Sequence, residues 1–287
     1  MDSKMRQYLV AAFASIALFN TAFADEPVDA SDSTIAEQRA ALASSADGIG
    51  FGPQSPRDIS VTTGSNTRVF GAAPAYTQMN LCNIHFHENA EHRGGEFTTY
   101  AGNGDGHGYK TGYKYDGELT AAERAPLDHK VGVSEHGDLE PGDTIEVHFV
   151  YSTAQVEPGP TLGACLNDAI GNPQLRVEAE VMVLVNDEQA LDFTKLAQVE
   201  KVNGYYQAPN LLETLGEPVT YAGSTTGPGY NEKASPFEVT WNVRPKVAHV
   251  NIQSVEAWLK DNPFEEDHAH GVRNLVVNPD LLSPITH

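Results

Sequence analysis

Three histidines in two strand-like runs place the strongest constraint on how this chain can fold. His85 and His87 are two residues apart in Asn-Ile-His-Phe-His (residues 83–87), and His148 lies in Thr-Ile-Glu-Val-His-Phe-Val (residues 144–150). Successive side chains of a strand point to opposite faces, so His85 and His87 share a face, and a neighbouring strand could place His148 beside them. Three neutral imidazoles with an open fourth position are typical of a catalytic zinc site. The pattern predicts that they bind Zn²⁺; the alternative is that one or more are ordinary surface or core histidines.

The rest of the sequence is typical of a mainly β protein with a few short helices. Seven segments rich in Val and Thr are separated by turn residues, which indicates a largely antiparallel sheet. They are residues 59–62, 67–70, 79–87, 145–151, 175–185, 237–243 and 246–252. A short helix is expected over residues 254–260, with Ser254 as its N-cap. Because no internal repeat or linker is visible, we expect one catalytic zinc domain over residues 51–287.

Residues 1–24 have the composition of an export signal. Lys4 and Arg6 precede a mostly apolar run, and Ala-Phe-Ala ends the segment as a small-x-small cleavage site. The apolar run is too short to cross a bilayer, and no later run approaches the roughly 18 apolar residues required. Residues 25–50 are expected to form a mobile lead-in with one or two helical turns. We therefore expect a signal peptide and an exported protein, either periplasmic or secreted.

The chain is strongly acidic. It contains 18 basic and 39 acidic residues, and loss of the signal removes two basic residues and one acidic residue, leaving a net charge of −22. Such a surface repels phosphate backbones and argues against a nucleic-acid partner, and it also disfavours anionic substrates. A small neutral substrate is indifferent to this field. The composition is therefore compatible with a small uncharged substrate.

Cys82 and Cys165 are the two cysteines of the chain. In an oxidising compartment a single disulfide is the default expectation, and two free buried thiols are the alternative. Cys82 is an odd number of residues from His85. Strand alternation therefore predicts that its sulfur lies on the face opposite the histidine pair, away from the metal.

Residues 101–141 form a long insertion between His87 and His148, and they begin with a glycine-rich run. A structureless segment of this length more often builds an active-site wall or lid. Asn103 and Asp105 could also bind calcium as alternating oxygen donors, but no Glu completes a loop of EF-hand spacing. We therefore expect the insertion to lie at the active site.

Two further polar side chains share a face with the histidines. Asn83 lies on the face of His85 and His87, and Glu146 lies on that of His148. Each is placed to accept a hydrogen bond from the ring nitrogen that does not bind the metal, which fixes the tautomer and raises the basicity of the ligand. For Glu146 the alternative is a solvated carboxylate that points outward.

Six motifs occur in the order seen in α-class carbonic anhydrases. They are Gln-Ser-Pro-Arg-Asp-Ile at 54–59, His-Phe-His at 85–87, Glu-His at 91–92, Glu-Val-His-Phe-Val at 146–150, Tyr-Ala-Gly-Ser-Thr-Thr-Gly-Pro at 221–228 and Val-Thr-Trp at 239–241. The sequence of residues 82–97, followed by Tyr-Ala-Gly-Asn-Gly-Asp-Gly at 100–106, resembles the δ class more closely still. Glu88, where the α class has an aromatic residue, and the long interval before the third histidine depart from the α class and agree with the δ class.

The resemblance implies a central, twisted, largely antiparallel sheet like that of the α class. It also implies a zinc enzyme that interconverts carbon dioxide and bicarbonate, with the three histidines as ligands. Val150 and Trp241 would then help to line an apolar pocket for carbon dioxide. Zinc suits this chemistry because it lowers the pKa of bound water from about 15.7 to about 7.

The resemblance also assigns the groups around the nucleophile. Thr226 would accept a hydrogen bond from the hydroxide at the metal, and Glu91 would orient that threonine. Thr226 is the ungapped match, and Thr225 takes its place if one residue has been lost. Turnover further needs a histidine that carries a proton to solvent. The sequence offers His92, His107, His129 and His136 for this step and does not choose among them.

Two other functions fit parts of the sequence. His85 and His87 followed by Glu91, with Pro-Gly at 141–142 ahead of His148, are similar to the two halves of a cupin metal site. Glu91 would then be a fourth ligand, and the metal would be iron or manganese, suited to oxygen chemistry. A non-catalytic exported metal-binding protein is the second alternative, and the combination of three histidines with a threonine candidate argues against it.

Overall fold

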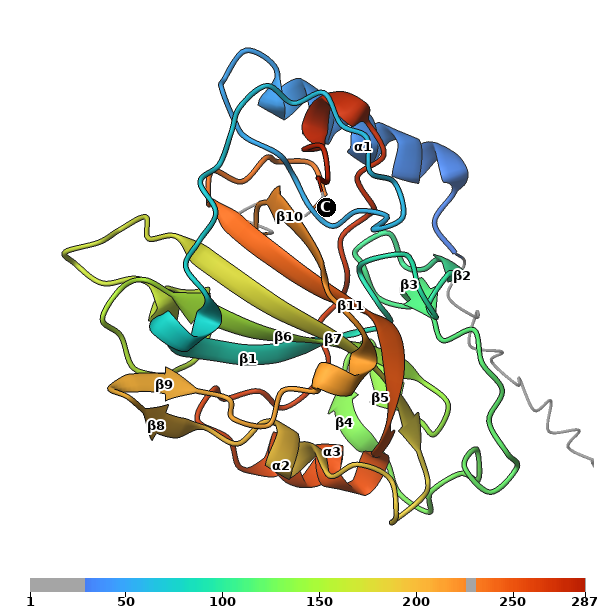
Figure 1. The fold of residues 1–287 in the computed structure, drawn as a ribbon. Helices are drawn as coiled ribbons and strands as arrows, with labels where there is room; N and C mark the ends of the chain where they lie inside the picture. The colour runs from blue at the N-terminus through green and yellow to red at the C-terminus, as the bar shows by residue number, and fades with distance from the viewer. Residues whose placement is uncertain (1–28, 226–230, 287) are drawn as a thin grey trace, which may run out of the picture.

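A five-stranded sheet forms the centre of the molecule, in the order β1-β6-β7-β11-β10 (Figure 1). The computed structural model describes residues 29–225 and 231–286, so the predicted signal peptide and Thr226 lie outside the described residues. The strands of the sheet are β1 (Asn80–Glu88), β6 (Thr144–Ser152), β7 (Leu175–Val185), β10 (Val219–Gly223) and β11 (Val239–Asn251). β7 and β11 are parallel, and the other neighbouring pairs are antiparallel. The prediction of a mainly β protein with a largely antiparallel central sheet is confirmed.

Short hairpins, helices and turns surround this sheet. The hairpins are β2 (Thr99–Asn103) with β3 (Thr111–Lys114), β4 (Val131–Ser134) with β5 (Gly137–Leu139), and β8 (Glu200–Val202) with β9 (Tyr205–Gln207). The helices are α1 (Asp32–Ala46), α2 (Phe193–Leu196) and α3 (Ile252–Lys260), and the 3₁₀ turns are η1 (Tyr76–Gln78), η2 (Leu162–Cys165), η3 (Glu213–Leu215) and η4 (Pro279–Leu281). None of the helices in the described part of the chain is both long and apolar enough to cross a membrane.

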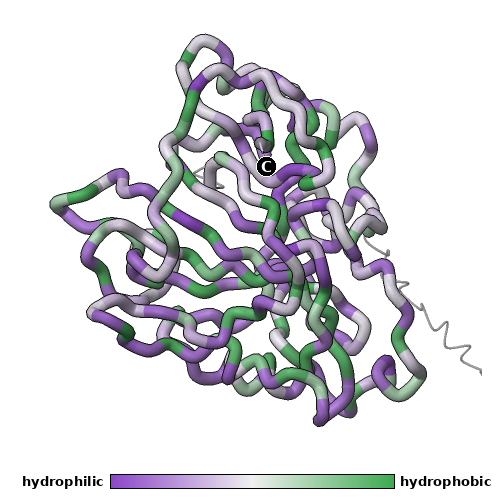
Figure 2. Tube along the Cα trace, in the orientation of Figure 1, coloured by the Kyte–Doolittle hydropathy of each residue, from purple (hydrophilic) through white to green (hydrophobic). Residues whose placement is uncertain are grey.

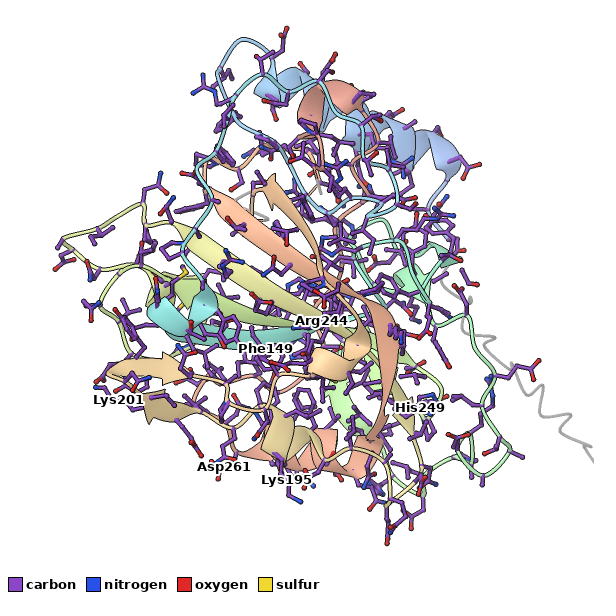
Figure 3. The ribbon with its side chains drawn as sticks, in the orientation of Figure 1. Phe149, Lys195, Lys201, Arg244, His249 and Asp261 are labelled. Carbon is purple, nitrogen blue, oxygen red and sulfur yellow. A yellow bond between two sulfur atoms is a disulfide. The ribbon has the colours of Figure 1, made fainter. Side chains whose placement is uncertain are left out.

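One face of the sheet packs against α2 and α3, and we call it the helix face. Phe86 and Phe149 extend from the sheet into a cluster with Phe193 of α2 and Trp258 of α3. The rings of Phe86 and Phe193 meet edge to face, with centroids 5.8 Å apart, an arrangement that aromatic pairs favour. Figure 3 shows the side chains on this side of the sheet, with Phe149 labelled among them. The helix face is thus an apolar core.

The opposite face of the sheet, which we call the histidine face, has a second apolar cluster that includes Val150, Val177 and Trp241. β6 is buried along its whole length, so its residues are enclosed on both faces. Figure 2 shows apolar segments along the central strands, interspersed with polar ones. Polar side chains on these strands are therefore enclosed by protein.

β11 joins two segments that the sequence patterns separate. Residues 237–243 and 246–252 were expected as two strands, but they belong to a single strand, β11, which pairs with β7 on both sides of a break. The register shifts between Val243 and Val247. Pro245 lies within this interval and has no N–H to donate to a ladder, which explains why the pattern breaks while the strand continues.

Residues 59–62 and 67–70, which were also expected as strands, have no regular secondary structure. Their neighbourhood pairs instead with the end of the chain, for example through the Asn66 N–H, which donates to the carbonyl of Leu282 at 3.1 Å. Individual hydrogen bonds to this distant segment pair the backbone N–H and C=O groups here without forming a β-ladder. Local β-propensity was overridden by this tertiary contact.

α1 is longer and more firmly packed than the lead-in predicted for residues 25–50. Ile35 and Leu42, two turns apart, are buried, and Gln38 Nε2 donates to the carbonyl of Gly106 at 2.8 Å. The remaining positions are mostly small or polar, so the sequence has no clear apolar stripe. The expectation of one or two helical turns is therefore corrected to a 15-residue helix.

α3 begins earlier than the sequence predicts. Its N-cap is Asn251, whose side chain accepts a hydrogen bond from the N–H of Gln253 at 3.0 Å. Ser254 lies inside the helix, where its hydroxyl donates to the carbonyl of Asn251 and accepts from the N–H of Phe193. The predicted cap is therefore wrong, and Ser254 instead connects α3 to α2.

The two cysteines form the predicted disulfide, but the side of the sheet predicted for Cys82 is wrong. The register of β1 and β6 shifts at this residue, because Leu81 pairs with Tyr151 and Asn83 pairs with Val150. In such a β-bulge, two residues of one strand oppose one residue of its neighbour. Leu81 packs on the helix face, whereas Cys82 packs in the cluster of the histidine face. The bulge interrupts the alternation on which the prediction rested.

Candidate metal centre and active-site pocket

Three imidazoles converge on the histidine face. His85 on β1 lies opposite His148 on β6 in the antiparallel ladder, and His87 follows two residues after His85. The ring centroid of His85 lies 5.2 Å from that of His87 and 5.1 Å from that of His148. The ring centroids of His87 and His148 lie 4.7 Å apart. One nitrogen of each ring lies within 4.8 Å of the other two. The structure therefore brings together the residues that strand alternation selected.

Two of the rings are oriented by the polar neighbours that the sequence indicated. Nδ1 of His85 lies 2.6 Å from Oδ1 of Asn83, and Nε2 of His148 lies 2.8 Å from Oε1 of Glu146. Amide and carboxylate oxygens accept hydrogen bonds, so these two ring nitrogens carry the protons. The free lone pairs are then on Nε2 of His85 and Nδ1 of His148.

The third ring is oriented by a residue that no motif identifies. Nδ1 of His87 lies 2.9 Å from the backbone carbonyl of Gly271, 184 residues further along the chain. The segment is held in place because His270 pairs with His87 in an isolated parallel bridge. Nε2 of His87 is therefore the nitrogen left with a lone pair. A backbone acceptor has no side-chain signature, so no sequence pattern could reveal it.

Burial keeps the first two rings neutral. Desolvation, together with the neighbouring His148 and His87, holds the pKa of His85 well below its usual value. Desolvation also lowers the pKa of His87 to about 4, although Glu91 opposes the shift. At neutral pH both rings are therefore uncharged, which is the form that binds a metal ion.

Glu146 lies at the centre of a buried hydrogen-bond chain. Its Oε1 lies 2.6 Å from Nδ1 of His92 and 2.8 Å from Nε2 of His148, and Nε2 of His92 lies 2.7 Å from the hydroxyl of Tyr221. Burial alone would raise the pKa of Glu146, but the charge interactions and hydrogen bonds of His92 and His148 outweigh it and hold that pKa well below its usual value. His92, Glu146 and His148 also group closely enough for a metal ion. Hydrogen bonds between them already explain that grouping.

Glu91 faces the site without joining the converging nitrogens. Its Oε1 accepts a hydrogen bond from the N–H of Arg273 at 3.0 Å. The nearest ring atoms are Nδ1 of His87 at 3.8 Å and Nε2 of His148 at 3.9 Å, and both already bond to other acceptors. The geometry therefore gives no support to Glu91 as the fourth ligand of a cupin-like site.

A cavity of about 30 Å³ lies against the three histidines. Its walls are Ser55, Pro56, His85, His87, Glu91, His148, Val150, Leu162, Val177, Thr225 and Trp241. Val150 and Trp241 were expected here from the resemblance, whereas Leu162 and Val177 were not. The cavity is small, and Val150, Leu162, Val177 and Trp241 give it an apolar surface, which suits a small uncharged molecule.

Comparison with known proteins gives the family. A family model described as Delta carbonic anhydrase matches residues 76–254, more than half of the chain. The chain belongs to the δ-class carbonic anhydrases. It is therefore an enzyme, a carbonic anhydrase with a small-molecule substrate, and its histidine cluster is a potential metal site of the kind that these metalloenzymes require.

Two solved structures are among those similar to this δ-class carbonic anhydrase. The α-carbonic anhydrase of Photobacterium profundum is 16% identical, with 84% of this chain and 91% of that chain covered and a TM-score of 0.28. A hyperthermostable carbonic anhydrase identified from an active hydrothermal vent chimney is 17% identical, with 78% and 85% covered and a TM-score of 0.28. A search of curated protein sequences finds no match.

The insertion of this δ-class carbonic anhydrase does not form the expected wall or lid of the pocket. Residues 101–141 contain the end of β2 and all of β3, β4 and β5. No residue of this segment lines the cavity. The carbonyl of Gly108 instead accepts a hydrogen bond from the N–H of Val272 at 2.8 Å. The insertion thus supports the backbone segment that carries Gly271 and Arg273, outside the pocket itself.

The candidate proton carriers are widely different in their surroundings. His92 is fully buried and both of its ring nitrogens are engaged, so it has no contact with solvent. His107 and His129 are exposed, His136 stacks on a tyrosine ring, and none of the three lines the cavity. His270, which the sequence did not single out, has its ring centroid 5.6 Å from that of His85. It is a fourth imidazole beside the cluster, outside the converging set.

Proposed function

We propose that this enzyme binds Zn²⁺ through His85, His87 and His148 and catalyses the reversible hydration of carbon dioxide to bicarbonate and a proton. The observation that carries the proposal is the meeting of three ring nitrogens at one small cavity with an apolar wall. The donor set fits zinc, since three neutral imidazoles leave a fourth position for the reacting molecule. Each outer ring nitrogen has an acceptor, which is the arrangement that stabilises histidine ligands.

Zinc, when bound, lowers the pKa of a coordinated water to about 7 and so supplies a nucleophile at neutral pH. The chain's own contribution is to orient the ligands and to shape the pocket. Val150, Val177 and Trp241 offer carbon dioxide an apolar surface beside the histidines. A neutral, apolar substrate favours such a surface over water, so binding there needs no charged partner.

We assign the orientation of the nucleophile to Glu91 and Thr226. The N–H of Arg273 holds one carboxylate oxygen of Glu91, which leaves the other to accept a bond from a threonine hydroxyl. Thr225 lines the cavity, with its Oγ1 3.3 Å from Oγ of Ser235. Thr226, which lies outside the described residues, is the ungapped match to the family motif and is therefore the proposed partner of Glu91.

Stopped-flow carbon dioxide hydration and metal analysis of the purified mature chain test the proposal. We expect one zinc per chain, and we expect His148→Ala to lose both zinc and hydration because two imidazoles cannot complete the site. His136→Ala is the matched control, since this histidine stacks on Tyr109 away from the cavity and should retain both properties. Zinc without hydration would indicate a metal-binding protein, and iron with oxygen consumption would indicate the cupin-like alternative.

We also propose that the protein is exported, to the periplasm or outside the cell. Support comes from the signal-like residues 1–24 and from the disulfide between Cys82 and Cys165, since disulfides persist in oxidising compartments. N-terminal sequencing of the protein from its own cells should give Asp25 as the first residue. An intact N-terminus in a cytosolic fraction would refute export.

A further inference from the structure

The loop that joins β6 to β7 (Figure 1) contributes a residue to the cavity at the candidate metal site. Within it, η2 supplies Leu162 to the wall of the cavity, although Leu162 lies outside every motif identified in the sequence. The same short turn ends at Cys165, whose sulfur is bonded to Cys82. One element therefore carries both a cavity residue and a covalent link to β1.

The β-bulge in β1 makes this link possible. Because Cys82 and Asn83 together oppose Val150, both side chains are available to the histidine face. Without the bulge, alternation would send the Cys82 sulfur to the helix face, away from the loop. The bulge lies three residues before His85, so the loop is attached to the strand that carries two of the proposed ligands.

Hydrogen bonds complete the attachment on either side of the disulfide. The N–H of Gly159 donates to the carbonyl of Cys82 at 3.0 Å, and Nδ2 of Asn83 donates to the carbonyl of Gly159 at 3.1 Å. At the start of the loop, Oγ of Ser152 donates to the carbonyl of Cys165 at 2.7 Å. Residues 153–165, which we call the clipped loop, are thus fixed to β1 at Cys82 and Asn83.

Asn83 connects the clipped loop to His85 of the candidate metal site. Its amide is 1% exposed and is held at both ends, by Gly159 through Nδ2 and by His85 through Oδ1. A carbonyl can only accept, so the bond to Gly159 requires the NH₂ group of Asn83 to face the loop. Oδ1 must then face His85, which requires the proton on Nδ1 and leaves the Nε2 lone pair directed into the cluster.

We propose that the clipped loop is the positioning element of the metal site: through Gly159 and Asn83 it sets the tautomer and direction of His85, and through Leu162 it closes the cavity. This inference rests on the proposed zinc function. Asn83 and Gly159 act through His85 and are positioning residues, whereas Leu162 lines the cavity itself. The disulfide keeps the loop on β1 and thereby keeps both effects together.

Asn83→Ala tests the connection to His85. We expect the zinc affinity, measured by competition with a chelator, to fall about 10- to 100-fold, the loss typical of removing a hydrogen-bond partner of a ligand. In the metal-free variant, ¹H–¹⁵N spectra of the imidazoles should show His85 as a mixture of tautomers, whereas the wild type has it protonated on Nδ1. Asn242→Ala is the control, because Asn242 is also a buried asparagine of the central sheet but donates to Glu178 of β7 and not to the clipped loop, and it should leave zinc affinity and the His85 tautomer unchanged.

The disulfide and Leu162 are tested separately. Reduction of the folded protein, or the double variant Cys82→Ser with Cys165→Ser, should lower zinc affinity by less than Asn83→Ala, because the hydrogen bonds of the loop remain. Leu162→Ala should leave zinc affinity unchanged and lower the kcat/KM of hydration. Ile170→Ala, an exposed aliphatic residue in the same connection, should change neither.

Two results would overturn the inference. If wild-type protein binds zinc and hydrates carbon dioxide but Asn83→Ala keeps wild-type affinity and the wild-type tautomer, the loop does not position His85, and the proposed function stands. If reduction and the double variant lower thermal stability alone, the disulfide stabilises the fold without acting on the site. A wild-type chain that binds no zinc would instead refute the proposed function, and the inference with it.

Discussion

Glu146 and Glu180 are both fully buried on neighbouring strands, yet their pKa values are shifted in opposite directions. Glu146 of β6 faces the histidines, and Glu180 of β7 points to the opposite face, since Glu146 is paired with Val181 and Glu180 with Val147. The pKa of Glu146 is held well below its usual value, whereas burial raises the pKa of Glu180 to about 7. The two side chains are buried to the same extent, so their hydrogen-bond and charge partners decide which carboxyl is charged.

The partners differ in number and in kind. Glu146 accepts hydrogen bonds from the backbone and ring of His92 and from His148. Glu180 accepts one bond, from the N–H of Leu212 at 2.6 Å, while Arg244 lies 3.9 Å away and Oε2 has no hydrogen-bond partner among the described residues. A buried carboxylate stays charged when donors surround it and is neutralised when they do not. The histidine face is thus built around a charge, whereas Glu180 on the helix face is a carboxyl that can lose its charge.

Glu180→Gln should give the largest effect, in the pH dependence of stability. The pKa of the Glu180 carboxyl is about 7 in the folded protein and about 4.5, its ordinary value, in the unfolded chain. Between these two pH values the folded state keeps the proton and the unfolded state has lost it. The unfolded state then binds fewer protons, so stability falls as the pH rises from about 4.5 to about 7. The full shift corresponds to roughly 3 kcal/mol. Gln cannot ionise, so urea unfolding should show similar stability near pH 4 and a more stable variant at pH 8; a pH-independent difference would contradict this assignment.

Glu146→Gln should lower zinc affinity by about 10- to 100-fold, because the amide cannot supply the negative charge that supports His148. Chelator competition at pH 7.5 measures the change. Glu180→Gln is the matched control, since it makes the same substitution on the other face and should leave the affinity unchanged. Equal losses in the two variants would show that the effect comes from general destabilisation and not from the hydrogen bond to His148.

Tyr221→Phe should have the smallest effect of the three. It removes the hydroxyl that forms a hydrogen bond with Nε2 of His92. This bond is the one farthest from the candidate metal site in the hydrogen-bond chain that runs through Glu146. We expect a loss of about 1 kcal/mol in the free energy of unfolding, the usual value of one hydrogen bond. Zinc affinity should fall less than in Glu146→Gln, because Glu146 keeps its bond to His148. A larger loss of affinity than in Glu146→Gln would mean that Tyr221 acts on the site by another route.

Alternation along single strands was sufficient to find the centre of the site. The placement of His85 and His87 on one face, and of Asn83 and Glu146 beside the rings, follows from a repeat of two residues within β1 and β6. The mainly β fold was predicted from a different signal, the Val- and Thr-rich segments separated by turn residues. The two-residue repeat failed at Cys82, because a bulge exists only where two strands meet in a particular register.

The sequence by itself determined which three histidines converge, their hydrogen-bond partners on the same strands and the pairing of the two cysteines. Tertiary structure alone decided that Gly271 would orient His87, that Arg273 would hold Glu91, and that Leu162 would close the cavity. The reason is physical: side-chain direction within a strand is fixed by local backbone geometry, whereas a backbone carbonyl or a loop residue gains its role only when distant segments pack together.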